Sequence, residues 1–161
     1  MAENENLAKV KDYIKHGVEH FNQGELDEAI TAYDKAIHLD PNNVIAYSNR
    51  GNAYVAQGDV EQAIADFDQA IRLDPNDAAV YFNRGIAYHS IGNNDHAIAD
   101  FDQAIRLDPN NAKAYCNRAV VHFNKGDLDK TIADLETALQ LDPDDSVARQ
   151  NLAVIKQKRG W

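Results

Sequence analysis

The chain has 161 residues, of which 44% are hydrophobic, and it carries a formal net charge of −10. This hydrophobic content is sufficient for a buried core, so the composition predicts a folded protein and excludes a fully disordered one. The excess of acidic residues argues against nucleic acid and anionic membrane as partners, because binding to phosphate relies mostly on lysine and arginine.

The N-terminal sequence MAENENLAKV lacks the basic region and the apolar segment of a secretory signal. No apolar run in the chain is long enough to cross a bilayer. Cys116 is the single cysteine, which precludes an internal disulfide and fits a reducing compartment. We therefore expect a cytoplasmic protein.

Four prolines give the chain a fixed period. Each follows the previous one by 34 residues, at Pro41, Pro75, Pro109 and Pro143. A period of this length is typical of an array of repeated structural units, and it outweighs any short local motif as evidence. The sequence therefore predicts a repeat protein.

The period divides the chain into successive segments. A lead-in of residues 1–9 is followed by unit one (10–43), unit two (44–77), unit three (78–111), unit four (112–145) and a terminal segment (146–161). In each unit a glycine separates two stretches with apolar residues at helical spacing; these glycines are Gly24, Gly58, Gly92 and Gly126. Each unit is therefore predicted to form helix, turn and helix, and the expected fold class is all-α.

Unit two illustrates the expected packing. Gly51 and Ala63 are small residues that let the two helices approach closely, while Tyr54 and Phe67 fill the space beside them. Pro75 ends the second helix, and the neighbouring Asp and Asn residues can cap the next one. A single helix pair leaves apolar surface exposed, so stability should come from stacking the units.

The residue pattern resembles the tetratricopeptide repeat. The segments YSNRGNAY and AIADFDQAIRLDP of unit two carry the pattern of that family, and the similarity covers residues 10–145. The resemblance implies a right-handed superhelical solenoid of antiparallel helix pairs, with a concave groove for peptide partners and a capping helix in residues 146–161. Unit four departs from the pattern at Ala119, Thr131 and Leu135.

The segment HGVEH, residues 16–20, matches a zinc-protease signature in which two histidines hold the metal and the glutamate acts as general base. Within the repeat, however, His16 aligns with arginines of the later units and His20 with Tyr or His, so both are expected at packing positions. A third ligand and a substrate cleft are also lacking. We therefore expect no metal, no cofactor and no catalysis.

Charges recur in pairs along the array. Units two to four each have an arginine in the first helix and an aspartate in the second, whereas unit one has His16 and Ala32 at these positions. We expect each arginine to meet an aspartate of its own or the adjoining unit in a partly buried hydrogen bond. These residues are Arg50, Arg84 and Arg118, with Asp66, Asp100 and Asp134.

By the same resemblance, the groove is lined by the first helix of each unit. The side chains expected there include Lys11, Lys15, Phe21, Asn49, Asn52, Phe82, Asn83, Ile86, Lys113, Asn117, Val120 and Phe123. The first helices of units two to four contain no Asp or Glu. Such a neutral-to-basic groove should accept a peptide with apolar anchors, either with or without a carboxylate.

Asn49, Asn83 and Asn117 occupy one position in three successive units. Their amides can bond to a peptide backbone, although the alternative is that asparagine is simply frequent there in the family. Some relatives bind acidic tails of heat-shock chaperones through a five-residue clamp. The matching positions here hold Ser48, Asn52, Asn83, Lys113 and Asn117, so two basic groups are missing and the full clamp is not expected.

These observations predict a non-enzymatic protein-interaction module that binds a partner protein or peptide in its groove. The alternative is a self-assembling scaffold that associates through the ends of the array and its acidic outer face, so a homo-oligomer is an open possibility. Trp161 is expected either as a loose tail or as a residue that docks on a neighbouring molecule.

Overall fold

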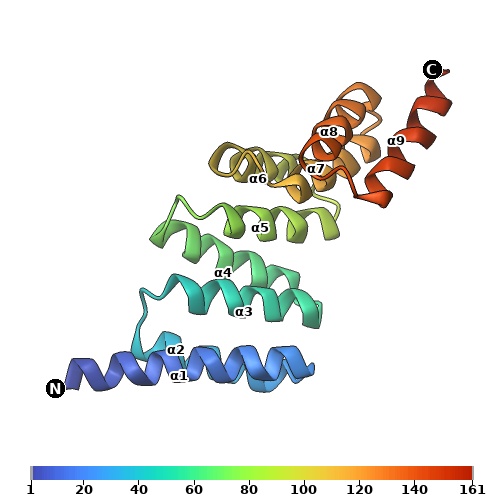
Figure 1. The fold of residues 1–161 in the computed structure, drawn as a ribbon. Helices are drawn as coiled ribbons and strands as arrows, with labels where there is room; N and C mark the ends of the chain where they lie inside the picture. The colour runs from blue at the N-terminus through green and yellow to red at the C-terminus, as the bar shows by residue number, and fades with distance from the viewer. Residues whose placement is uncertain (1, 161) are drawn as a thin grey trace.

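The protein is an all-α solenoid (Figure 1). The computed structural model describes residues 2–160, with the side chains of residues 5–160, and this part of the chain forms nine helices and no strand. The helices are α1 (Ala2–Gln23), α2 (Leu26–Leu39), α3 (Val44–Gln57), α4 (Val60–Leu73), α5 (Ala78–Ser90), α6 (Asn94–Leu107), α7 (Ala112–Asn124), α8 (Leu128–Leu141) and α9 (Ser146–Arg159). The predicted all-α repeat fold is confirmed.

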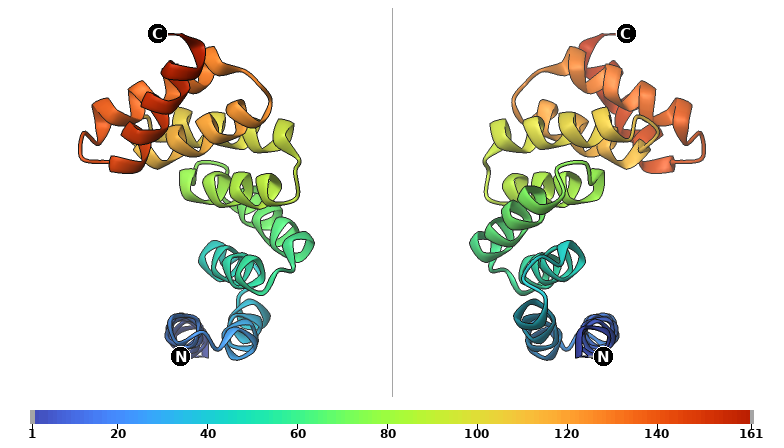
Figure 2. Two further views of the ribbon diagram at one scale, coloured as in Figure 1. Left: turned by 90° about the vertical axis from the view of Figure 1, so that its right-hand side faces the viewer. Right: turned by 90° about the vertical axis from the view of Figure 1, so that its left-hand side faces the viewer.

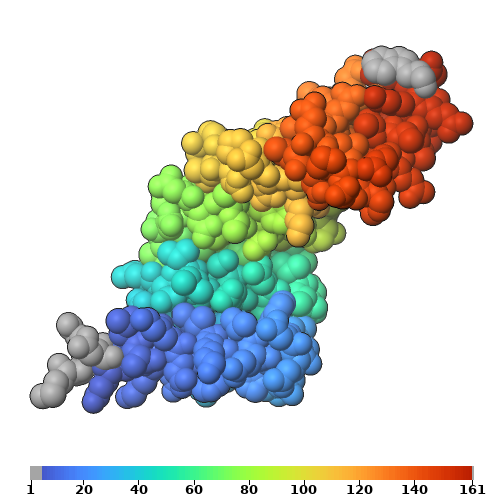
Figure 3. Space-filling view, in the orientation of Figure 1, coloured from blue at the N-terminus to red at the C-terminus, as the bar shows by residue number. Residues whose placement is uncertain are grey.

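The helices pack as a stack of pairs. Within each unit the first helix packs on the second, and the second helix also contacts the first helix of the next unit. The first helices of neighbouring units touch as well, in the pairs α1 with α3, α3 with α5, and α5 with α7. Figure 2 shows that the stack is curved and that the two termini lie at opposite ends. In the space-filling view each unit rests on the one before it (Figure 3).

Polar side chains and glycines set the helix ends. Asn43 accepts a hydrogen bond from the Ala46 backbone N–H at 3.0 Å and so caps the start of α3. Gly58 ends the same helix with φ of 92°, a left-handed conformation that favours glycine. The Asn or Asp before α3, α5, α7 and α9, together with the glycine at or just after the end of each, therefore explains why these four helices have nearly equal lengths of 13 or 14 residues.

The core of units one to three contains an aromatic ring packed against a glycine of the first helix. Phe67 is fully buried, and a Cβ atom on Gly51 would lie 2.8 Å from its ring. Phe101 and Gly85 repeat this arrangement. The predicted close approach of the two helices at Gly51 is confirmed, since an added methyl group would collide with the ring.

The ends of the array differ from its middle. The described part of the predicted lead-in, residues 2–9, belongs to α1 and is helical. At the other end α9 packs on α8, as expected of a capping helix, and it ends at Gly160. The prediction for Trp161 falls outside the described residues. Within residues 2–160, no helix is both long and apolar enough to cross a membrane.

Candidate functional site

All the predicted groove residues lie on the first helices of the four units. They are Lys11, Lys15 and Phe21 on α1, Asn49 and Asn52 on α3, Phe82, Asn83 and Ile86 on α5, and Lys113, Asn117, Val120 and Phe123 on α7. The three lysines, Val120 and Phe123 are exposed, and the remainder are partly buried. Contacts between neighbouring first helices place α1, α3, α5 and α7 next to one another along the stack.

Three of these residues also support the core. Phe21 packs against Tyr33 and its neighbours, while Phe82 and Ile86 pack against a cluster around Phe101. The ring centroids of Phe82 and Phe101 are 5.9 Å apart. Substitution of these residues by polar ones would therefore disturb the fold as well as any groove.

The asparagines at the repeated position differ in their hydrogen bonding. The Asn117 amide donates to the Lys113 carbonyl oxygen at 2.8 Å. The half-buried amides of Asn49 and Asn83 make no hydrogen bond to another described residue. Because an amide offers two donors and an acceptor, these two side chains are available to an incoming backbone.

A cavity of about 410 Å³ opens between α7, α8 and α9. Its walls are mainly apolar and consist of Ala119, Val120, Phe123, Thr131, Leu135, Gln150, Asn151, Val154 and Ile155. A smaller cavity of about 120 Å³ adjoins it, because the two share Val120, Leu135 and Asn151. We call the pair the α7–α9 cavity. Three of the predicted groove residues, Asn117, Val120 and Phe123, are brought together here.

Sequence reasoning missed the contribution of α9. Asn151 follows Asn117 by 34 residues, so α9 continues the repeat and its asparagine series. The Lys158 ammonium lies 5.6 Å from the centre of the ring of Phe123, a residue that lines the α7–α9 cavity. The spacing from Asn117 was a signal that could have identified α9 as a further first helix.

Beyond unit one, the first helices are free of acidic side chains, whereas α1 contains Glu3, Glu5, Asp12 and Glu19. None of α3, α5, α7 and α9 contains Asp or Glu, whereas α2, α4, α6 and α8 each contain three. Asp145 precedes α9 and lines the smaller cavity, where it accepts bonds from the Val147 and Ala148 backbone. Burial, and then the nearby Asp145, raise the pKa of the Cys116 thiol to about 11, so this thiol is neutral.

Each arginine of units two to four bridges two second helices. Arg84 donates from Nε and Nη2 to both carboxylate oxygens of Asp100 on α6, at 2.8 and 2.7 Å. Its Nη1 donates to Asp68 on α4 at 2.5 Å. The predicted pairing within the unit is confirmed, and the structure adds the second acid, from the preceding unit. The corresponding sets are Arg50 with Asp66 and Asp34, and Arg118 with Asp134 and Asp102.

The arginines are also held by aromatic rings. The Arg84 guanidinium lies 5.7 and 5.8 Å from the ring centres of Tyr81 and Tyr88. The hydrogen bond to Asp66 raises the pKa of Arg50 above its usual value, although burial acts in the opposite direction. These arginines are therefore structural charges that join successive units, and they are not available to a ligand.

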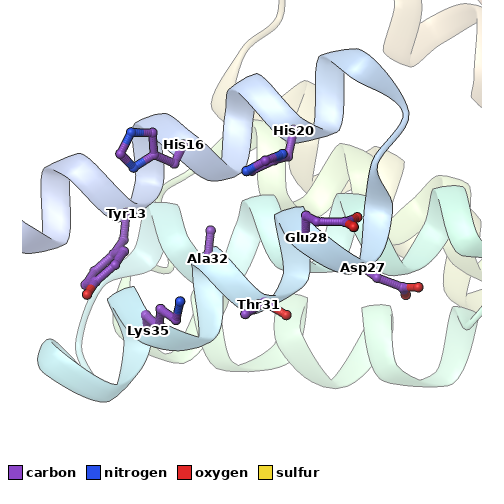
Figure 4. A pocket seen from close by; sticks show the side chains of 8 residues that line it. All are labelled: Tyr13, His16, His20, Asp27, Glu28, Thr31, Ala32 and Lys35. Carbon is purple, nitrogen blue, oxygen red and sulfur yellow. The ribbon is translucent and has the colours of Figure 1, made fainter.

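HGVEH lies at the uncovered end of the stack. The expectation that His16 packs is wrong, because 50% of its side chain is exposed and its nearest acid is Asp12, at 3.7 Å. His20 contacts Glu25 at 2.6 Å instead. Both histidines border an open pocket between α1 and α2, which Figure 4 shows. Among the described residues, no three His, Cys, Asp or Glu side chains are placed to hold a metal ion.

The sequence matches known repeat families over most of its length. The family described as TPR repeat matches residues 17–58, 51–92 and 87–126, and the family described as Tetratricopeptide repeat matches residues 112–145. Among curated proteins, none matches significantly.

Solved structures share the fold. A crystal structure of MamA is 30% identical with a TM-score of 0.84, and the match covers 89% of this chain and 84% of that one. The first TPR of Spaghetti (RPAP3), bound to the HSP90 peptide SRMEEVD, is 27% identical with a TM-score of 0.72, covering 76% and 97%. The chain therefore belongs to the tetratricopeptide-repeat family, whose members generally mediate interactions between proteins and are generally not enzymes.

Proposed function

We propose that this protein is a non-enzymatic interaction module that binds a peptide segment of a partner protein along α3, α5, α7 and α9. The observation that carries the proposal is the segregation of charge. In a chain with a net charge of −10, these four helices contain no acidic residue. Their shared side is therefore the part of the surface that can accept a neutral or acidic peptide without repulsion.

The asparagine series supports an extended peptide as the ligand. Asn49, Asn83, Asn117 and Asn151 recur at the period of the array, one on each of these helices. A peptide backbone presents donors and acceptors at regular intervals, and side-chain amides can pair with both. A folded partner surface or a small molecule does not present donors and acceptors at such regular intervals, so an extended peptide matches the series better.

The related domain bound to the HSP90 peptide shows that this fold can hold an acidic peptide. At the positions of the carboxylate clamp, however, this chain has Ser48 and Asn117 in place of basic residues. We therefore propose a different partner peptide, recognised with fewer charges. The single Cys116 fits a partner encountered in the cytoplasm, and neither nucleic acid nor membrane is proposed as a ligand.

A pull-down from native lysate tests the proposal with a groove variant. Asn49→Ala, Asn83→Ala and Lys113→Glu remove two amides and invert one charge without touching the core. Phe82 is left intact because its ring packs against Phe101. We expect the groove variant to lose partners that the wild-type protein retains, provided that both melt at similar temperatures.

A matched control changes the same types of residue on the second helices. Gln62→Ala, Gln140→Ala and Lys130→Glu alter exposed positions on α4 and α8 with the same change in charge. This control variant should keep the partners. Loss of partners in the control and their retention in the groove variant would contradict the proposal and place the interaction surface on the second helices.

A second candidate function, self-assembly through the ends of the array, is favoured by one observation. The side of α1 and α2 that carries Tyr13, His16 and His20 is open, whereas the corresponding side of each later unit is covered by the preceding second helix. Light scattering over a range of concentrations tests it. A mass that rises with concentration supports assembly, and a constant monomer mass rejects it.

A further inference from the structure

The three departures of unit four from the repeat pattern meet at one place. Ala119, Thr131 and Leu135 come from α7 and α8, and all three line the α7–α9 cavity. In unit three the same positions hold Gly85, Ala97 and Phe101, and all three are buried. The Phe101 ring lies against Gly85 and belongs to the same core cluster as Ala97. The departures are therefore one coordinated change of packing.

Two of the three changes depend on each other. A Cβ atom on Gly85 would lie 2.8 Å from the Phe101 ring, so a ring at this position requires glycine opposite it. Leu135 is shorter than phenylalanine and leaves room for the methyl group of Ala119, which is itself buried. The smaller Cys116 also stands where unit three has Phe82, whose ring packs against Phe101.

The space that two rings fill in unit three thus stays partly open in unit four. Side chains at the opening are exposed although they are apolar: Val120 by 42%, Phe123 by 39% and Val154 by 46%. The main cavity, at about 410 Å³, falls within the range of about 300–1,000 Å³ typical of ligand pockets. It is large enough for one aliphatic or aromatic side chain.

The charges around the opening favour a partner carboxylate. Neither α7 nor α9 contains an acidic residue. Lys158 lies over the Phe123 ring, and it forms no ion pair with another described residue. Asp145, which lines the smaller cavity, is already engaged by the backbone N–H groups at the start of α9 and by the Cys116 thiol at 3.7 Å.

We propose that the α7–α9 cavity receives one large apolar side chain of the bound peptide, and that an acidic residue next to it contacts Lys158. The inference rests on the proposed function, because it assigns a specific anchor to a peptide bound along the first helices. Unit four is then the unit that selects the ligand, while the asparagines of units two and three contact its backbone.

The test uses peptides selected from a display library of random short sequences with the wild-type protein as bait. In the double variant Ala119→Gly with Leu135→Phe, the new phenylalanine ring fills the cavity. This variant should fold, because units two and three already contain this combination of glycine and phenylalanine. Val154→Glu places a negative charge at the opening, on an exposed site, and serves as an independent variant. Fluorescence anisotropy then measures the affinity of each enriched peptide.

We expect enriched peptides to share one large apolar residue beside Asp or Glu. The cavity-filled variant and Val154→Glu should each bind them about tenfold to a hundredfold more weakly, the effect of losing one buried apolar side chain. Lys158→Gln should weaken binding several-fold and reduce its sensitivity to salt.

Two results would overturn the inference in distinguishable ways. Peptides that bind both cavity variants at full affinity, but lose affinity for Asn49→Ala with Asn83→Ala, would reject the cavity as anchor and leave the proposed groove in place. Peptides unaffected by any of these substitutions, or a library from which nothing is enriched, would reject both the cavity and the groove.

Discussion

Units three and four share the arginine bridge but differ in the core beneath it. Arg84 and Arg118 contact their aspartates with nearly the same geometry. Beside this constant feature, unit three has a glycine under a phenylalanine ring, and unit four has Ala119 under Leu135. The comparison teaches that the arginine contacts joining the units are uniform, whereas the side-chain changes that open the α7–α9 cavity occur in unit four.

The buried acid of the shared bridge gives the largest expected effect. Asp100 is 6% exposed, and Asp100→Ala leaves the Arg84 guanidinium without its bidentate partner. We expect the free energy of unfolding to fall by about 2–4 kcal/mol, since removing one member of a largely buried pair leaves a poorly compensated charge. Urea denaturation followed by circular dichroism measures the change.

The second acid of the bridge is the control for this prediction. Asp68 is 44% exposed, so Asp68→Ala should cost less than about 1 kcal/mol. Equal losses in the two variants would show that the bridge does not depend on burial. Full stability of both Asp100→Ala and Arg84→Leu would refute a structural role for the bridge.

Transplanting the core of unit four into unit three tests the coupling of glycine and ring. Gly85→Ala alone should destabilise the protein by about 1–3 kcal/mol because its methyl group meets the Phe101 ring. With Phe101→Leu the collision disappears. A double-mutant cycle in urea should therefore show a double variant that is more stable than the sum of the single effects.

Additive effects would contradict the argument that Ala119 and Leu135 arose as one change. They would also weaken the expectation that the reverse pair, Ala119→Gly with Leu135→Phe, folds normally in unit four.

Because His122 is buried in unit four, we expect it to make the stability of the fold depend on pH. Burial lowers the pKa of this imidazole below 6.5, an effect that Asp134 opposes only in part. Below about pH 6.5 the unfolded chain takes up a proton that the folded chain resists, so acidification favours unfolding through this group. His122→Tyr, which copies Tyr88 of unit three, should be relatively more stable than wild type as the pH falls.

Thermal unfolding of both proteins between pH 7.5 and pH 5 measures the difference, and the carboxylates common to both cancel. A difference in melting temperature that is constant over this range would show that His122 does not titrate between the folded and unfolded states.

The smallest effect concerns an outer row of contacts between units. Lys125 of unit four donates a hydrogen bond to Asp95 of unit three, and Gln57 of unit two donates one to Asp27 of unit one. In unit three the position equivalent to Gln57 and Lys125 holds Ile91, which is exposed. The position equivalent to their partners Asp27 and Asp95 holds Glu61 in unit two. Ile91→Lys should add up to about 1 kcal/mol at low salt. Ile91→Gln controls for loss of the apolar side chain, and no difference between the two would remove any role for charge.

Much of the fold could be predicted because the prolines mark a 34-residue period, and residues at equivalent positions of successive units make similar contacts. The pairing of Arg84 with Asp100 followed from charges that occur together in three units. The contact with Asp68 was missed because it joins neighbouring units, so a comparison of aligned positions within units does not reveal it. The cavity was missed for a different reason: it arises from space that smaller side chains leave open.

The most direct test of peptide binding along the first helices is a map of backbone amide chemical shifts. A selected peptide is titrated into the ¹⁵N-labelled protein, and the perturbed residues are assigned. The account predicts that shifts concentrate on α3, α5, α7 and α9, with the largest around Val120 and Val154. Shifts concentrated on α2, α4, α6 and α8 would contradict it and place binding on the acidic side of the array.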